Sequence, residues 1–566
     1  MTLRYLITAA LPYINNVPHL GHIVGSHLPA DVFYRFCKMR GYDCTFVGGS
    51  DEYGTPSLMA ARKLGVPVRQ LVDALHPIHK EIYRWFGISY DNYSRTSNEV
   101  HTSNVNEIFH RLIETESIDE QAVEMYYCAN DDLFLSDRFV VGRCPRCNYS
   151  NANGDQCEQC GYLVNVGDLI EPICILCDKA ATVKTTKHLF FKLTAYEQAI
   201  GQFIDAKKGV WRDTVVHIAQ EWLKAGLRDR SITRDLPWGV KINRPGYENK
   251  VLYVWFEALM GYVSFTKELG PTVFEKYWKD KDSRVVHFLG KDNIPFHTVF
   301  WPAILMAHGR LNFPYSIAGY QYLTFEGKKF SKSERVGVFC YGLPASGIDV
   351  DTLRSYLVQI LPESKDADFK WEEYKTFVNS ELIGKFGNFF NRVISMINRY
   401  FGSKVGLTDI RLDAADEEFV RQCREKIRLI DELLSKVEIK DAYKEVMNLA
   451  MLGNQYLSVK APWDLAKANK MEEAGRTLFI CLNLSRALAT LAYPFTPFSM
   501  ERVWKSQLKM NTDITKSWDA EDPLITLPPN HEIGQPEPLY KKVEDSDVEV
   551  FRQKTSSDFD LNSLVR

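Results

Sequence analysis

Residues 5–51 read YLITAALPYINNVPHLGHIVGSHLPADVFYRFCKMRGYDCTFVGGSD, and this stretch decides the fold class. Residues 5–10 form an apolar run typical of a buried strand, and a proline-containing loop follows them. Apolar residues then recur near helical spacing from Leu20 to a stop at Gly41, and residues 44–47 form a second strand-like run. Strand, helix, strand is a βαβ unit. It predicts an α/β fold with a parallel sheet whose ligand site lies at the carboxyl ends of the strands.

The pattern around this unit gives two further expectations. Pro29 falls inside the predicted helix, so we expect a kink or a shorter helix there, because proline lacks the backbone N–H that helices use. Further strands of the same α/β pattern are expected at residues 252–255 and 285–289.

The chain of 566 residues is too long for one hydrophobic core, so several domains are expected. From about residue 369 to 508 the sequence changes to long amphipathic stretches typical of a helical bundle. After residue 511 it is polar, and we expect it to be loosely packed, with residues 538–540 able to dock on the body.

The composition of the chain indicates its cellular compartment but does not identify its binding partner. No signal peptide is expected, because residues 1–4 lead straight into the first strand, and the most apolar helical stretch, 478–491, is too short to span a membrane. The net charge of −3 does not exclude nucleic acid, since basic residues can gather on one face. Isolated cysteines do not suggest a disulfide framework, so a reducing compartment and a cytoplasmic location are expected. They are Cys37, Cys44, Cys340, Cys423 and Cys481.

A cysteine-rich block interrupts the α/β pattern. Cys144 and Cys147 form one CxxC pair, and Cys157 and Cys160 form a second pair after nine intervening residues. Two such turns can present four thiolates to one tetrahedral ion, which predicts a structural zinc site. No open coordination position is implied, so a catalytic metal is not expected.

His19-Leu20-Gly21-His22 stands where the loop enters the first helix. Two imidazoles three residues apart share a helical face, and a helix start offers N–H groups to phosphate. Gly21 would let a flat base or ribose approach the backbone. Alone, the segment is equally consistent with two ordinary histidines at a helix start.

Residues 327–333, GKKFSKS, form a basic, hydroxyl-rich loop that could close over phosphates. By itself it reads better as a solvated loop. An HxGH helix start followed by a KxSKS loop in an α/β chain is much more specific than either motif.

These motifs resemble the class I aminoacyl-tRNA synthetases, most closely methionyl-tRNA synthetases of the archaeal and eukaryotic cytosolic type. The other matching stretches are ALPY (10–13), GSDEYGT (49–55), YVWFEA (253–258), GKD (290–292) and KAPW (460–463). Together they cover about residues 4–510, nearly the whole chain.

The resemblance implies a domain order. It comprises a Rossmann catalytic core in residues 1–114 and 234–320, a connective insertion with a zinc knuckle in 115–233, a stem-contact region with the KFSKS loop in 321–368, a helical anticodon-binding domain in 369–510 and a tail in 511–566.

It also implies a reaction in two steps. The methionine carboxylate attacks the α-phosphorus of Mg-ATP to give methionyl-adenylate and pyrophosphate, and the terminal ribose hydroxyl of tRNA(Met) then takes the methionyl group, for protein synthesis initiation and elongation. His19, His22 and Lys332 would stabilise phosphate charge. The implied ATP-binding residues are His19, Gly21, His22, Gly290, Asp292, Lys329 and Lys332.

The methionine site is expected beside Asp51, which ends a predicted strand. A carboxylate there can hold the substrate ammonium, with the Leu11 carbonyl as second acceptor. Aromatic rings attract a polarizable thioether and exclude water, although each ring alone could equally be core packing. The implied set is Leu11, Tyr13, Asp51, Trp255, Ala258, Tyr262 and His297.

The chain departs from the family near this pocket. Leu259 stands where many relatives have proline, and Asn293 where some have isoleucine. Arg234 matches an arginine near the active site, with a surface role as the alternative. The insertion looks too small for an editing domain, which disfavours Val, Ile and Leu as substrates, because apolar pockets separate them by only about 1–3 kcal/mol.

Two accessory sites follow from the resemblance. Cys174 and Cys177 lack a second CxxC pair, and Cys128 with Asp131 stands in its place, so a second zinc is left open.

Asn388, Arg392 and Trp463 match residues that read the anticodon, and these types suit stacking and edge hydrogen bonds on single-stranded bases. Lys385 and Arg399 could hold phosphates.

Three alternatives remain at this point: a synthetase for another amino acid, a small-molecule nucleotidyltransferase, and a non-enzymatic tRNA-binding scaffold. A monomer is expected, because no additional C-terminal domain of the kind that dimerises bacterial relatives is evident. Association with a larger synthetase assembly is left open.

Overall fold

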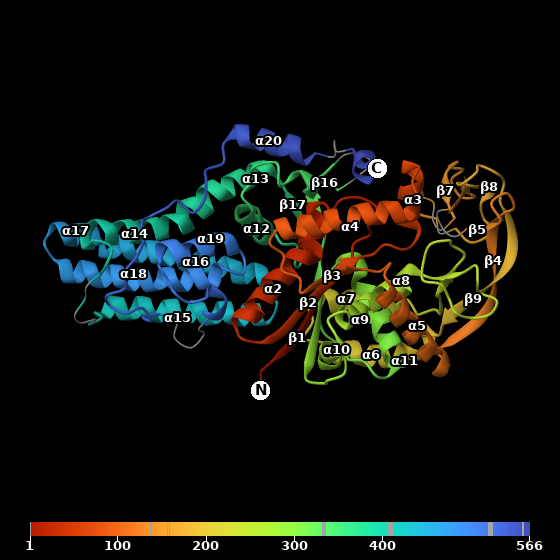
Figure 1. Cartoon of the computed structure of the whole chain (residues 1–566), viewed down its shortest axis with the longest axis horizontal. Helices are drawn as coiled ribbons and strands as arrows, with labels where there is room; N and C mark the ends of the chain where they lie inside the picture. Colours follow the sequence, from red (N-terminus) through yellow and green to blue (C-terminus); the bar gives the residue numbers. More distant parts are fainter. Residues whose placement is uncertain are drawn as a thin grey trace.

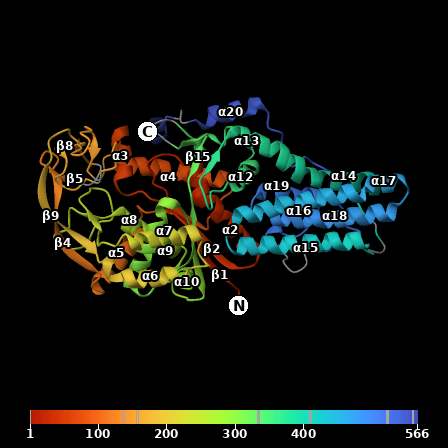
Figure 2. The ribbon, with the colours of Figure 1, turned by 180° about the vertical axis from the view of Figure 1, so that it is seen from behind.

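The molecule is elongated, with an α/β body and a helical bundle at opposite ends (Figures 1 and 2). It is a computed structural model that describes residues 2–135, 139–154, 157, 159–162, 164–330, 336–405, 407, 411–518, 524–556 and 560–566. The cysteine-rich insertion lies at the far end of the α/β body, away from the bundle.

A parallel five-stranded sheet with the order β14-β13-β1-β2-β3 forms the centre of the α/β body. Its strands are β1 (Arg4–Ala9), β2 (Asp43–Ser50), β3 (Asn92–Arg95), β13 (Ser283–Gly290) and β14 (Pro314–Tyr320). Strand β1, which precedes the insertion, thus pairs with β13, which follows it. In such a sheet the order reverses beside β1, and the crevice at the carboxyl ends there is the usual ligand site. The Rossmann-type core is confirmed.

The helix after β1 is interrupted just before Pro29, as the sequence predicts. Short α1 (Leu20–His22) passes into a π-helical segment, Ile23–His27, and then into α2 (Leu28–Met39). Pro29 therefore sits in the first turn of α2, where its missing N–H costs least.

One predicted strand is wrong. Only Val251–Leu252 is extended (β12, paired with β11, Thr233–Arg234), and Val254–Glu257 is the helical turn α8. A short apolar run fits a buried helix as well as a strand, so periodicity could not separate them.

Helices flank the sheet and continue into the insertion. On the α/β body they are α3 (Thr55–Leu64), α4 (Val68–Trp85), α5 (Glu99–Glu114), α9 (Gly261–Lys267), α10 (Pro271–Trp278) and α11 (Trp301–His308). After α5, β4 (Ile118–Cys128) pairs antiparallel with β9 (Thr182–Phe191) in a sheet with β5 (Leu133–Leu135) and β10 (Arg230–Ser231). The insertion adds β6 (Val140–Arg143), β7 (Ala152–Asn153), β8 (Ile170–Cys174), α6 (Glu197–Asp205) and α7 (Asp213–Lys224).

A small module joins the body to the bundle. It contains β15 (Leu323–Phe325), β16 (Lys328–Lys329), β17 (Ala367–Phe369), α12 (Val350–Gln359) and α13 (Trp371–Thr376). The bundle follows with α14 (Asn388–Phe401), α15 (Ala414–Ser435), α16 (Ile439–Lys460), α17 (Pro462–Lys467), α18 (Met471–Ala492) and α19 (Pro497–Arg502).

Arg354 of α12 fixes the junction between these parts. It is fully buried and donates to Asp31 of α2 at 2.7 Å. It also donates to the carbonyls of Phe86 (2.7 Å), Pro494 (2.9 Å) and Phe495 (3.0 Å). A buried guanidinium with all these partners is costly to separate.

The C-terminal segment is more ordered than expected. Residues Leu539 and Tyr540 are buried, and helix α20 (Asp545–Thr555) packs on α13 of the joining module before α21 (Leu561–Val565). A Cβ at Gly342 would lie 1.7 Å from the Lys554 carbonyl oxygen, so only glycine allows this close approach. The apolar residues of α20 hold this helix in place. They were not noticed in the sequence because the segment as a whole is polar.

Among the described residues, no helix combines the length and apolarity that a bilayer crossing requires.

Candidate active site

Six residues predicted to bind the nucleotide line one cavity of about 410 Å³ at the carboxyl ends of β1 and β13. They are His19, Gly21, His22, Gly290, Asp292 and Lys329. Leu11 lines the same cavity. Lys332, together with the rest of 331–335, lies outside the described residues.

The two histidines are held by the start of α1. His19 Nδ1 accepts from the Gly21 N–H at 3.1 Å, and His22 Nδ1 accepts from the His19 N–H at 3.2 Å. Their ring centroids lie 3.9 Å apart. In a neutral imidazole whose Nδ1 accepts, the proton is on Nε2. Both rings can therefore offer an N–H to a phosphate oxygen.

Gly21 and Phe330 shape the wall beside His19. A Cβ at Gly21 would lie 2.8 Å from Cε1 of His19, so a side chain there would displace the ring. Phe330 stacks on His19 with centroids 4.6 Å apart and planes 14° apart. The basic loop thus reaches the cavity at Lys329 and Phe330.

Asp292 lies opposite, immediately after β13. The hydroxyl of Tyr322 donates to it, and Lys291 lies 5.6 Å from the Tyr322 ring centroid. Tyr322 is 39% exposed and was not predicted. Because it fixes the Asp292 carboxylate at the rim, it belongs to the site.

Asp51 follows β2, one strand from the nucleotide cavity. It is buried, and its oxygen Oδ1 has no hydrogen-bond partner in the described part of the chain. Burial, and then the charge of Glu257, raise the pKa of Asp51 well above its usual range. A buried acceptor without a donor is suited to a cationic ligand.

The aromatic residues form two pairs around Asp51. Trp255 donates from Nε1 to the Tyr13 hydroxyl, and the Tyr262 hydroxyl lies 2.8 Å from Nε2 of His297. The charge of Asp51 raises the pKa of both Tyr13 and Tyr262 in addition to the effect of burial. Leu11 and Ala258 pack in the same hydrophobic cluster as Tyr13 and Tyr262.

Of the two departures from the family, Asn293 lines the nucleotide cavity and Leu259 belongs to the hydrophobic cluster of the α/β body. Leu259 is buried, and the Asn293 carbonyl accepts from Nδ1 of His297 at 2.9 Å. With Nδ1 donating, Nε2 of a neutral His297 accepts from Tyr262. Asn293 therefore orients His297 through its backbone, which any residue could supply.

A second cavity of about 970 Å³ is lined in part by Tyr13 and Trp255. Its wall includes Arg62 and Lys63 of α3, together with Tyr253. The guanidinium of Arg234 lies 3.9 Å from the Tyr253 ring centroid, so Arg234 stands behind this wall.

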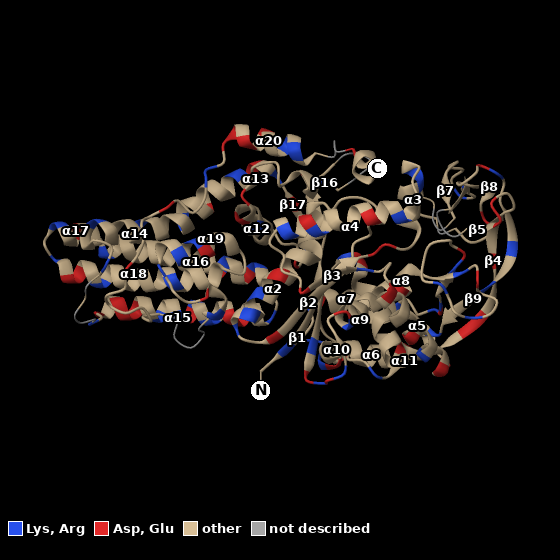
Figure 3. Ribbon diagram, in the orientation of Figure 1, with Lys and Arg blue, Asp and Glu red and all other residues tan. Residues whose placement is uncertain are grey.

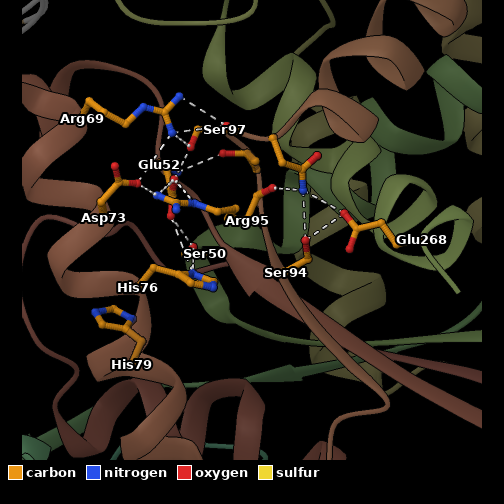
Figure 4. A network of polar contacts seen from close by, with 12 residues as sticks. Ser50, Glu52, Arg69, Asp73, His76, His79, Ser94, Arg95, Ser97 and Glu268 are labelled. Carbon is orange, nitrogen blue, oxygen red and sulfur yellow. Dashed lines mark hydrogen bonds and ion pairs between the residues drawn. The ribbon is translucent and has the colours of Figure 1, made fainter.

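A buried polar network holds the backbone on both sides of Asp51 (Figure 4). Glu52 accepts from Ser50 Oγ at 2.9 Å and from Arg95 Nε at 2.8 Å, and its carbonyl accepts from Trp238 Nε1 at 2.7 Å. The several partners of Glu52 hold this part of the backbone in place.

Two groups in the insertion are able to hold a metal ion. The ligand atoms of Cys144, Cys147, Cys157 and Cys160 all lie within 4.8 Å of one another. The same holds for the second group: Cys128, Asp131, Cys174 and Cys177. In that group Asp131 Oδ2 lies 3.3 Å from Cys128 Sγ and 3.2 Å from Cys174 Sγ.

At the far end of the bundle, the three predicted anticodon residues form one cluster. Arg392 lies 5.4 Å from the ring centroid of Trp463. Asn388 Nδ2 and Arg392 Nη1 donate to Asn454 Oδ1 at 3.4 and 3.2 Å. Asn454 of α16 was not predicted; it connects Asn388 and Arg392.

Charges around the bundle are mixed. Lys385 is paired with Glu381 at 2.6 Å, and Arg399 lies over Tyr400 at 5.4 Å. Figure 3 shows basic and acidic residues interspersed on the bundle and on the α/β body, with neither half of one sign.

Comparison with known proteins gives matches over nearly the whole chain. The model of the family described as "tRNA synthetases class I (M)" matches residues 5–394. That of the "Anticodon binding domain of methionyl tRNA ligase" matches residues 409–559.

Three relatives named as methionine–tRNA ligases illustrate the similarity. A methionine–tRNA ligase of Pyrococcus furiosus is 38% identical over 97% of this chain and 76% of its own. One of Ignicoccus hospitalis is 40% identical over 95% of each chain. A "probable methionine–tRNA ligase, cytoplasmic" of Dictyostelium discoideum is 38% identical over 97% of this chain and 75% of its own.

A solved structure has the same fold. It is titled "Mycobacterium tuberculosis methionyl-tRNA synthetase in complex with methionyl-adenylate", and its TM-score is 0.79 at 24% identity. The match covers 95% of this chain and 100% of the other.

Proposed function

The chain belongs to the methionyl-tRNA synthetase family, and from that premise we propose how its residues carry out the reaction. As a methionine–tRNA ligase it activates methionine and joins it to tRNA. One observation supports this placement of the reaction. The cavity that contains His19 and His22 lies next to the strand that buried Asp51 follows.

In this proposal the cavity holds Mg-ATP. The Nε2–H groups of His19 and His22 donate to phosphate oxygens and stabilise the charge that develops as pyrophosphate leaves. Asp292 contacts the ribose, and Lys329 and Lys332 neutralise phosphates from the loop. No side chain acts as a covalent nucleophile, so positioning and charge stabilisation carry the rate.

Methionine lies beside the nucleotide cavity. Asp51 holds its ammonium, and Tyr13, Trp255, Tyr262 and His297 surround its side chain. The methionine carboxylate then attacks the α-phosphorus, the bond to pyrophosphate breaks, and methionyl-adenylate forms.

ATP–pyrophosphate exchange across the amino acids tests this directly. Exchange should depend on methionine, with valine, isoleucine and leucine far weaker. Equal exchange with another amino acid would assign a different substrate. tRNA binding without any exchange would favour the scaffold alternative.

We propose that both four-ligand groups of the insertion hold structural zinc, the second with Asp131 as a carboxylate ligand, which zinc accepts. Metal analysis of the purified protein should give two zinc ions per chain. Asp131→Ala should reduce this to one, and Asp131→Cys should keep two. One zinc in the unaltered protein would exclude the second site.

The second cavity is suited to the unpaired acceptor end of tRNA, because it joins the methionine pocket at Tyr13 and Trp255 and presents Arg62 and Lys63. Replacing both cations by alanine should slow transfer from preformed enzyme-bound adenylate by about tenfold or more, since phosphate contacts are lost. Pyrophosphate exchange should not change.

Single-turnover transfer measures this effect. The matched control is Arg84→Ala on α4, whose cation is 64% exposed and paired with Glu81. Loss of exchange together with transfer would place Arg62 and Lys63 in the first step instead.

We further propose a cytoplasmic monomer that serves initiation and elongation of protein synthesis. Its mass in solution measures the oligomeric state and shows any association with other synthetases.

A further inference from the structure

Glu257 is a buried carboxyl group that the proposed reaction does not yet use. It ends α8 between Trp255 and Ala258, and its side chain is fully buried. Its oxygen Oε2 lies 2.6 Å from Nε2 of His101. The other oxygen, Oε1, has no hydrogen-bond partner among the described residues. An unsatisfied buried acceptor needs an explanation, and a ligand is one.

The position of Glu257 joins it to the amino-acid pocket. Its charge raises the pKa of Asp51, second only to burial, and the charges of both carboxyls raise the pKa of Tyr13. Leu11 packs against Gly261, four residues after Glu257, because a Cβ at Gly261 would lie 3.0 Å from Cδ2 of Leu11. Asp51, Glu257 and Leu11 therefore converge on one small region.

The partners of His101 indicate where the proton lies. Ser264 Oγ donates to the Met260 carbonyl at 3.0 Å and accepts from Asn104 Nδ2 at 2.9 Å. Its single hydrogen is thus used, so it also accepts from His101 Nδ1, at 2.9 Å. Nε2 of a neutral His101 then accepts, and the carboxyl of Glu257 donates its O–H.

Burial favours the same arrangement. It lowers the pKa of His101 to about 3 and raises that of Glu257 well above its usual range. Two neighbouring buried carboxyls do not both ionise readily. With an ammonium bound, Asp51 would carry the one negative charge, and Glu257 would present a neutral C=O through Oε1.

We propose that Glu257 is the third acceptor for the methionine ammonium, beside Asp51 and the Leu11 carbonyl, and that it acts as a neutral carboxylic acid. A primary ammonium has three N–H donors, which these acceptors would satisfy together. One negative charge would face one positive charge. The inference rests on the placement of methionine beside Asp51.

Two substitutions of similar length separate this role from packing. Glu257→Met removes the acceptor and should raise KM for methionine in pyrophosphate exchange by about 10- to 100-fold, the range for a hydrogen bond to a charged group. Glu257→Gln should stay within about threefold of the unaltered protein, because its amide can donate to His101 and present its C=O to the ammonium.

A substrate analogue without the ammonium completes the test. Inhibition by 4-(methylthio)butanoate should be the same for Glu257→Met and the unaltered enzyme. Equal weakening of methionine and this analogue would show pocket collapse and overturn the proposal. So would a Glu257→Gln variant as weak as Glu257→Met, or no effect of either.

The control variant is Glu107→Met, a carboxylate 66% exposed and paired with Lys267. Methionine-dependent exchange by the unaltered enzyme is measured in the same series. If the unaltered enzyme showed no methionine-dependent exchange, the proposed reaction would be wrong, and the role of Glu257 would fail with it for that separate reason.

Discussion

Asp51→Asn should lower kcat/KM for methionine in pyrophosphate exchange by about a hundred- to a thousandfold. The substitution keeps the shape but removes the negative charge that faces the substrate ammonium in the proposed binding mode. Losing one member of a buried charge pair costs about 2–5 kcal/mol, and about 1.4 kcal/mol is a factor of ten. KM for ATP should change little, because the nucleotide cavity is lined by other residues.

The folded state offers a second readout. Burial raises the pKa of Asp51, so the folded protein holds its proton more tightly than the unfolded chain. Stability due to this group therefore falls as pH rises from the unfolded pKa to the folded one. Asparagine removes that penalty, so Tm at neutral pH should not fall. An unchanged kcat/KM would remove Asp51 from the site, and Asp119→Asn on the surface of β4 is the control.

Trp463→Ala should reduce tRNA charging by about two orders of magnitude while methionine-dependent pyrophosphate exchange stays near normal. Stacking on an aromatic ring contributes about 1–3 kcal/mol per base, and this ring also lies beside Arg392. The nucleotide and methionine residues belong to the α/β body, at the other end of the molecule (Figure 1). Adenylate formation should therefore be unaffected.

The charging assay should be run at several tRNA concentrations, so that KM for tRNA and kcat separate. Phe498→Ala, an exposed aromatic of α19, is the matched control. Equal loss of charging and exchange in Trp463→Ala would contradict the division of roles between the two ends.

Sequence reasoning located the βαβ unit because apolar runs of strand length flank a stretch with helical spacing that ends at Gly41. It also grouped Asn388, Arg392 and Trp463, though only through resemblance, because their contact joins α14 and α17 across the bundle. The strand expected at residues 252–255 was wrong, since a short apolar run does not distinguish a strand from the helical turn α8.

The missed residues share a physical reason. Asn454, Tyr322 and His101 matter because of partners far away in the chain. The spacing of residues in the sequence gives no information about such partners. Glu257 did leave a signal. A lone acidic residue inside the apolar run YVWFEALM is expensive to bury, and such a cost indicates a function.

Arg354 has one more consequence. Since its guanidinium ties α12 to α2 and to the carbonyls after α18, the two ends of the enzyme cannot hinge freely about that joint. The distance between the two ends of the protein is then fixed. On the proposed binding mode, a nucleic acid would have to present its loop and its terminus at the matching span, so its length would contribute to selection together with base identity.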